Sequence, residues 1–235
     1  MHVSRALRQA RDDGDVCPRG VPDVTSIAGG EHRFHSSGMS GGCYDRRMSE
    51  MARRRATRAD LEALPRSVCA ELIRGTLYTL PRPRFRHQLA GTATSAALFG
   101  SYGEGRAGPG GWWILSEPGI ELPELDVIEI SPDVAGWRRE RMPEPPDGPI
   151  LIAPDWACEV LSPSTRAHDQ RIKRPLYAQA GVRWLWFIDV DARTLTASRL
   201  ENGRWSELGV WADDEVARIE PFTEIEFRLA DLWTR

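Results

Sequence analysis

The chain has 235 residues and a formal net charge of −3, which by itself gives no argument for nucleic-acid binding. No stretch approaches the roughly 18 apolar residues that cross a bilayer, and no apolar segment of a secretory signal follows Met1. The four cysteines are widely spaced without a CxxC pattern, which argues against a structural zinc site and a disulfide-bonded scaffold. We therefore expect a cytoplasmic protein with no membrane partner.

Composition also predicts where the ordered domain begins. Residues 1–52 are rich in Gly, Ser, Arg and Asp and lack hydrophobic periodicity, which is typical of a disordered tail. Met48 and Met51 stand directly before the ordered pattern, and we expect one of them to be the true start of the protein. One ordered domain is expected over residues 53–235.

The first half of this domain shows local signals for helices, a hairpin and strands. A short helix is expected at 57–64, a hairpin of strands 69–73 and 76–80 follows, and a helix is expected from 85 to about 102. The Gly-rich stretch 103–111 lacks the Lys-Ser/Thr ending of a phosphate-binding loop. Two strand regions are then expected, at 112–122 and 126–137.

The second half continues this alternation of strands and helices. A strand is expected at 155–161, a helix at 168–180 with a break at Pro175, and a further strand at 183–189. The Asn202-Gly203 dipeptide predicts a hairpin of strands 194–200 and 204–211. A last strand is expected at 224–229. Strands dominate and two helices are long enough to cover them, which predicts a mixed α/β domain around one sheet, with the nine tryptophans mostly in its core.

Glu159 is the most informative candidate for a functional residue. Period two places it on one side of its strand together with Asp155, Ala157 and Leu161. A carboxylate in the middle of an apolar strand is costly to bury without a partner, so we expect either a basic side chain or a metal ion beside it. The alternative is a purely structural ion pair with an arginine at the end of the strand.

Asp133 supplies a second acid on a neighbouring strand region. It follows Pro132 at a bend, so it is either a ligand for a metal or a structural cap of the turn. The Pro-rich stretch between the two acids suits two adjacent strands joined by a loop. Glu71, in the first hairpin, gives a weaker signal, and His87 is expected to be a surface residue at the start of a helix.

Lys173 is the third candidate, on the helix that follows Glu159. Asp169 lies four residues before it, so an exposed helical ion pair worth about 0.3–0.5 kcal/mol is the alternative to a functional role. Further basic side chains surround it, and they predict either a solvated face or a phosphate-binding rim. These residues are Arg166, His168, Arg171 and Arg174, with Arg138, Arg139 and Arg141 as a possible extension.

Several segments together resemble the Uma-type family of putative restriction endonucleases, a branch of the PD-(D/E)XK nuclease superfamily. They are 70–78, 81–83 with 86–88, 131–137, 154–165, 169–173, 176–178 and 180–182. The resemblance implies a restriction-endonuclease-like fold, with a mixed central sheet flanked by helices, and Mg²⁺-dependent (or Mn²⁺-dependent) cleavage of DNA. By analogy it also implies a homodimer.

The resemblance further implies roles for four residues. Asp133 corresponds to the PD aspartate and Glu159 to the (D/E) position, both as metal ligands, and Glu71 to an auxiliary acid of the first motif. The usual lysine two positions after Glu159 is replaced by Leu161, and Lys173 of the next helix stands in for it. Hard oxygen ligands are those that Mg²⁺ prefers, and a lysine stabilises charge that develops on the phosphate.

Two other functions stay open at this point. One is a nuclease-fold protein without catalysis that acts as a DNA-binding or assembly module. The other is hydrolysis of a different phosphodiester, such as RNA. A titration with Mg²⁺ followed by thermal denaturation distinguishes a metal-binding site from one that binds none.

Overall fold

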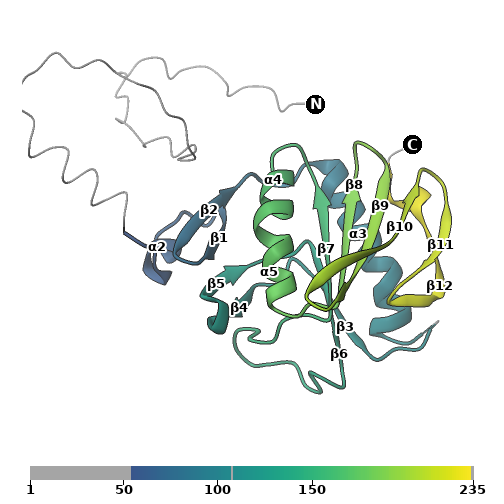
Figure 1. Ribbon diagram of the computed structural model, residues 1–235, viewed down its shortest axis with the longest axis horizontal. Coiled ribbons are helices and arrows are strands. Elements are labelled where there is room, and N and C mark those ends of the chain that lie inside the picture. Colours follow the sequence, from purple (N-terminus) through teal and green to yellow (C-terminus); the bar gives the residue numbers. More distant parts are fainter. Residues whose placement is uncertain (1–53, 107, 234–235) are drawn as a thin grey trace, which may run out of the picture. The chain divides into compact units, whose positions relative to one another are not determined.

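The computed structural model describes residues 54–106 and 108–233, which contain both strands and helices (Figure 1). The expected tail over 1–52 lies outside the described residues. In chain order the helices, short 3-10 or π turns (η) and strands are α2 (Arg58–Glu62), β1 (Cys69–Ile73), β2 (Thr76–Leu80), α3 (Phe85–Leu98), η1 (Phe99–Gly103), β3 (Trp112–Ser116), β4 (Ile120–Leu122), η2 (Pro123–Leu125), β5 (Val127–Ile130), β6 (Val134–Arg138), β7 (Trp156–Leu161), α4 (Arg166–His168), η3 (Asp169–Lys173), α5 (Arg174–Gln179), β8 (Trp184–Asp189), β9 (Thr194–Glu201), β10 (Arg204–Ala212), β11 (Val216–Ile219), β12 (Phe222–Arg228) and η4 (Leu229–Leu232). The predicted mixed α/β class is confirmed.

The strands form a central six-stranded sheet and two smaller sheets. The central sheet has the order β10-β9-β8-β7-β6-β3, in which β7 and β8 run parallel and all other neighbours are antiparallel. A four-stranded sheet has the order β2-β1-β5-β4, and β11 pairs with β12. The predicted mixed central sheet is therefore present, but the expectation that it holds all the strands is wrong.

The two long strands predicted at 112–122 and 126–137 are each divided between two sheets. β3 and β6 pair in the central sheet, whereas β4 and β5 pair in the four-stranded sheet. The divisions fall at Pro118 and Pro132, whose missing N–H groups cannot continue a ladder of backbone hydrogen bonds. The segment from β3 to β6 is thus one long hairpin. Both of its arms pass from the central sheet to the four-stranded sheet at Pro118 and Pro132.

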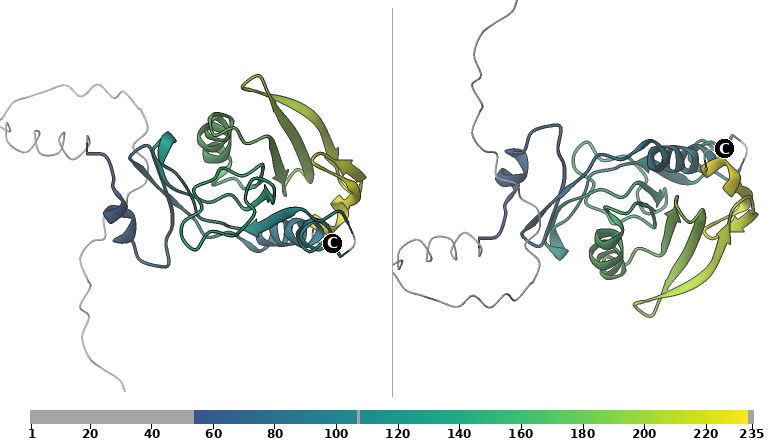
Figure 2. Two further views of the ribbon diagram at one scale, coloured as in Figure 1. Left: turned by 90° about the horizontal axis from the view of Figure 1, so that it is seen from below. Right: turned by 90° about the horizontal axis from the view of Figure 1, so that it is seen from above.

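Two hydrophobic clusters lie on opposite faces of the central sheet. β7 is buried along its whole length; Trp156, Cys158 and Val160 face one cluster, while Ala157 and Leu161 face the other. α3 contributes to the first cluster and α5 to the second, so the two helices cover opposite faces, as the turned views in Figure 2 show. Six tryptophans among the described residues are buried, which agrees with their predicted place in the core.

The helical segment after β7 is continuous from 166 to 179, so the predicted break at Pro175 is wrong. Pro175 is the second residue of α5 and follows directly after a π-helical turn, which accommodates it within the continuous helix. The preceding turn widens into a π-helix in which the N–H of Arg174 donates to the carbonyl of Asp169. No helix among the described residues is long and apolar enough to cross a membrane.

Candidate active site

The point where the long hairpin changes sheets brings the predicted acids close to one another. The N–H of Glu117, beside Pro118, donates to the carbonyl of Asp133, which ties the two bends together. Val134 pairs with Cys158, and continuing this antiparallel register places Asp133 opposite Glu159. The predicted arrangement of two acids on neighbouring strands therefore agrees with the pairing of β6 and β7.

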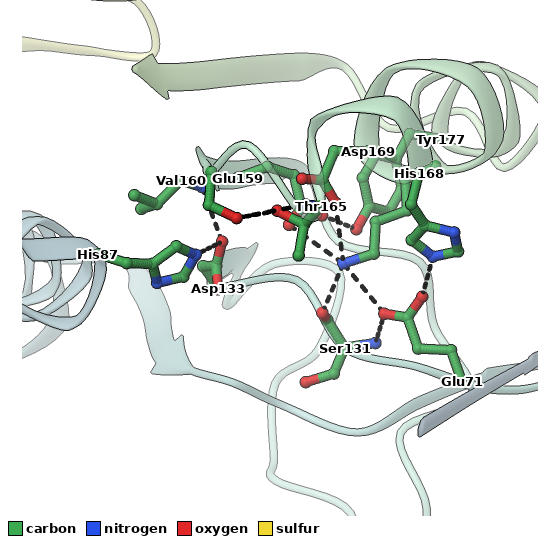
Figure 3. A network of polar contacts seen from close by, with 12 residues as sticks. Glu71, His87, Ser131, Asp133, Glu159, Val160, Thr165, His168, Asp169 and Tyr177 are labelled. Carbon is green, nitrogen blue, oxygen red and sulfur yellow. Dashed lines mark hydrogen bonds and ion pairs between the residues drawn. The ribbon is translucent and has the colours of Figure 1, made fainter. Parts of the chain in front are cut away.

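Lys173 lies within a buried network of polar side chains. Figure 3 labels Glu71, Glu159 and Asp169 of this network. Nζ of Lys173 lies 3.0 Å from Oε1 of Glu71 and 3.1 Å from Oε2 of Glu159, and donates to the carbonyl of Ser131 at 2.8 Å. Asp169 is farther away, at 3.9 Å. Because Lys173 and Asp169 are each only 3% exposed, the alternative of an exposed helical ion pair is wrong.

Glu71 and Glu159 share this ammonium group but hold their protons with different strength. Burial raises the pKa of Glu71, but Lys173 and a 2.6 Å contact with Nε2 of His168 outweigh it, so its pKa lies below the ordinary value. Burial raises the pKa of Glu159 well above its ordinary value, more than Lys173 lowers it. The hydroxyl of Tyr177 donates to Oε1 of Glu159 at 2.5 Å. A proton entering the network therefore binds Glu159 more readily than Glu71.

Asp133 makes a structural contact as well as facing the network. Its Oδ2 accepts the backbone N–H of Val160 at 2.7 Å, at the position where the register reaches Pro132 and the ladder ends. The same oxygen lies 3.4 Å from Nε2 of His87. The cap alternative for Asp133 is therefore partly supported, although the capped group belongs to a neighbouring strand and not to the turn itself.

His87 is not the surface residue that was expected. Its side chain is only 11% exposed, at the beginning of α3, and it faces Asp133. Burial lowers the pKa of His87, but the hydrogen bond and charge of Asp133 outweigh this, so the pKa lies above its ordinary value. His87 thus adds positive charge to the acidic cluster.

The predicted basic rim is only partly assembled. Arg166 is paired with Asp189 at 2.7 Å, and Arg171 and Arg174 are exposed on the same helix. The expected extension by three further arginines is wrong, because β6 and β7 are antiparallel and these residues lie at the end of β7 remote from Glu159. There Arg138 stacks over Trp112, Arg139 donates to the carbonyl of Gly103, and Arg141 pairs with Asp155.

Two residues of the network, His168 and Tyr177, were not singled out from the sequence. His168 was grouped with the basic cluster, and Tyr177 entered only as part of a family segment. For Tyr177 the sequence does contain a signal. Asp169, Lys173 and Tyr177 are spaced by four residues, which places all three on one helical face. The apolar Leu176 next to them shows that this face is the buried one.

The donor chemistry of the site fits a hard divalent cation. Among the described residues, no three His, Cys, Asp or Glu side chains are gathered as a preformed metal cage. Mg²⁺, however, is commonly held by one or two carboxylates and several waters. Asp133 and Glu159, on adjacent strands, supply two such carboxylates. The oxygens of Glu159 also accept bonds from Lys173 and Tyr177, which orient the carboxylate.

The structure is that of a mixed α/β protein with a buried acidic network beside its central sheet. A model of the Uma2 family, described as "Putative restriction endonuclease", matches residues 58–231, and the chain belongs to this family. The fold is similar to that of a putative nuclease of the DUF820 family from Anabaena variabilis, with a TM-score of 0.57 and 22% identity. That similarity covers 74% of this chain and 95% of the other chain. No curated protein matches the sequence.

Proposed function

We propose that this protein is a metal-dependent endonuclease that hydrolyses DNA phosphodiester bonds. The observation that carries the proposal is the buried network in which Lys173 lies between Glu71 and Glu159, with Asp133 on the adjacent strand. Burying several charged groups costs free energy that a structural role alone does not require. A carboxyl group whose pKa is raised well above its ordinary value, as burial does to Glu159, is typical of functional sites.

In this proposal Asp133 and Glu159 hold Mg²⁺ or Mn²⁺. When bound, the metal polarises the scissile phosphate and lowers the pKa of a coordinated water. Lys173 orients the carboxylate of Glu159 and places a positive charge close to the reacting phosphate, where negative charge develops. Glu71 is the auxiliary acid, which fixes Lys173 and His168 through its two oxygens.

His87 and Tyr177 complete the proposed machinery as positioning residues. His87 orients Asp133, whose Oδ2 is also fixed by the N–H of Val160. Tyr177 donates to Glu159 and so determines which of its oxygens faces Lys173. We further propose a cytoplasmic homodimer acting on DNA, and sedimentation of the full chain with and without DNA tests this assembly.

A second candidate is a catalytically inactive nuclease-fold module that binds DNA or assembles with a partner. The observation that favours it is that both oxygens of Glu159 already accept bonds from Lys173 and Tyr177. Leu161, which stands where the superfamily has its lysine, is buried against the second hydrophobic cluster. The same folded network would then be a structural remnant.

Cleavage of plasmid and single-stranded DNA by the full chain, with Mg²⁺ or Mn²⁺, separates the two candidates. Glu159→Gln and Lys173→Met are the test variants. Asp155→Asn is the matched control, because Asp155 is an acid directly before the same strand and pairs with Arg141 at the end remote from Glu159. Metal-dependent cutting that both test variants lose and the control keeps supports the nuclease. The absence of cutting by the parent protein supports the inactive module.

A further inference from the structure

A polar groove of about 350 Å³ lies between the helical segment 166–179 and the hairpin of β9 and β10. Leu161, at the end of β7, also lines it, two residues after Glu159. The groove and the candidate active site therefore share the end of β7 and the helical segment that carries Lys173. Its volume is within the range of small-molecule sites.

The groove has one basic wall and a floor of hydroxyl groups. Arg166, Gln170 and Arg174 are spaced by four residues, so they project from one face of the helical segment. Thr196 and Ser198 alternate along β9 and face the same side of the sheet. Ser198 is only 6% exposed although it lines the groove. No hydrogen-bond partner of its hydroxyl is found among the described residues.

Trp205 of β10 forms an aromatic surface at the far wall. It is half-buried, and its indole N–H donates to the backbone carbonyl of Arg174 at 3.0 Å, which fixes the orientation of the ring. The two arginines of the groove differ in whether an acid compensates their charge. Arg166 is neutralised by Asp189, and Glu207 lies on the opposite wall, whereas the exposed guanidinium of Arg174 has no ion pair within the described part of the chain.

We propose that this groove binds a single unpaired nucleotide of the DNA strand that enters the active site. A guanidinium, a fixed aromatic ring and several hydroxyl groups match, respectively, the phosphate, the base and the polar edges of a nucleotide. The phosphate binds at Arg174, away from Glu207, and the base stacks on Trp205. A groove of about 350 Å³ is in the size range of a site for one small ligand, such as a single nucleotide.

This proposal deepens the proposed function, because it assigns single-stranded DNA, or an unpaired position in a duplex, as the preferred substrate. Binding at the groove is tested separately from nuclease activity by measuring it in EDTA, where no metal-dependent cutting occurs. The probe is a fluorescein-labelled oligothymidylate of about ten nucleotides, and binding to the full chain is followed by anisotropy. A blunt duplex of equal length is the comparison.

Arg174→Gln and its matched control Arg171→Gln test the phosphate contact. Both arginines are exposed on the same helical segment, but only Arg174 lines the groove. We expect the parent protein to bind the single strand more tightly than the duplex. We expect Arg174→Gln to bind it about tenfold more weakly and Arg171→Gln to bind it like the parent.

Tryptophan fluorescence locates the base. Stacking on Trp205 quenches its emission, so the quench on adding oligothymidylate should disappear in Trp205→Phe, which keeps an aromatic ring for binding. It should persist in Trp211→Phe, a half-buried tryptophan of the same strand outside the groove. Equal weakening by the two arginine variants, or an unchanged quench in Trp205→Phe, overturns the proposal. If the parent protein cuts DNA but gives either of these results, the nucleotide-binding groove is refuted and the proposed nuclease activity is not. If Arg174→Gln loses binding but the parent protein does not cut DNA, the proposed nuclease activity is refuted and the nucleotide-binding groove is not.

Discussion

Replacing Lys173 by Met tests whether the buried ammonium compensates the acids around it. The substitution preserves the length of the side chain but leaves Glu71 and Glu159, both 1% exposed, without their common cation. Removing one partner of a buried charged pair typically costs about 3–5 kcal/mol. For a domain of this size that corresponds to a decrease in Tm of roughly 10 °C.

The pH dependence of this loss follows from the direction of each pKa shift. The pKa of Glu71 is lowered in the folded state, so its stabilising contribution is present above about pH 4.3 and is lost as the pH falls through the folded pKa. The pKa of Lys173 is raised, mainly by Glu159 and Glu71 against the effect of burial, so its contribution is present below about pH 10.4. Both contributions are present at neutral pH. The cost of Lys173→Met should therefore be largest there and should decrease as the pH falls below about 4.3, where the stabilising contribution of Glu71 is progressively lost.

Urea denaturation followed by tryptophan fluorescence, at about pH 7 and pH 4, measures this difference. Arg171→Met is the matched control, because Arg171 is an exposed residue of the same π-helical turn and should change stability by less than about 0.5 kcal/mol. Equal effects of the two variants at pH 7 would refute the reasoning. A loss for Lys173→Met that does not depend on pH would also refute it.

Three further substitutions test separate contacts. Because the pKa of His87 is raised in the folded state, its contribution to stability is present below about pH 6.5 and is lost as the pH rises through the folded pKa. The difference in Tm between the parent protein and His87→Gln should therefore decrease from about pH 6 to pH 8.5. A difference that stays constant contradicts this. Tyr177→Phe removes the donor to buried Oε1 of Glu159 and should cost about 1–3 kcal/mol in urea denaturation, whereas no change would mean that another donor replaces the hydroxyl. Gly136→Ala would place a Cβ 3.1 Å from Ile114 and 3.3 Å from Trp156, and should destabilise the central sheet by about 1–3 kcal/mol; unchanged stability would show that these side chains can separate.

Elements determined by local sequence were predicted well, and elements determined by tertiary pairing were not. Asn202 and Gly203 both have positive φ, as the two-residue hairpin between β9 and β10 requires, and the dipeptide alone indicates this turn. The division of the long strands at Pro118 and Pro132 was missed. A proline indicates that a ladder stops, but it does not show that the chain continues as a strand in a second sheet.

The candidate site shows the same division between local and tertiary information. Period two placed Glu159 on a buried face, and the cost of burying its charge predicted a cationic neighbour; the structure places Lys173 there. The contacts of Glu71 with His168, and of Asp133 with His87, join segments far apart in the sequence. No local pattern encodes such pairs, so the chemical type of each residue was visible but its partner was not.

The balance of charge in the network explains why a cation-dependent function fits it better than a purely structural one. Three buried acids (Glu71, Glu159 and Asp169) surround the ammonium of Lys173; Glu71 also contacts His168, and burial raises the pKa of Glu159 and Asp169. A structural ion pair needs one acid for each base, and every further buried carboxylate destabilises the fold unless it is protonated. An excess of acids is instead what a divalent cation requires, because its two charges compensate the carboxylates that the lysine leaves unpaired. In the proposed function, binding of the cation would recover part of the free energy lost in burying them.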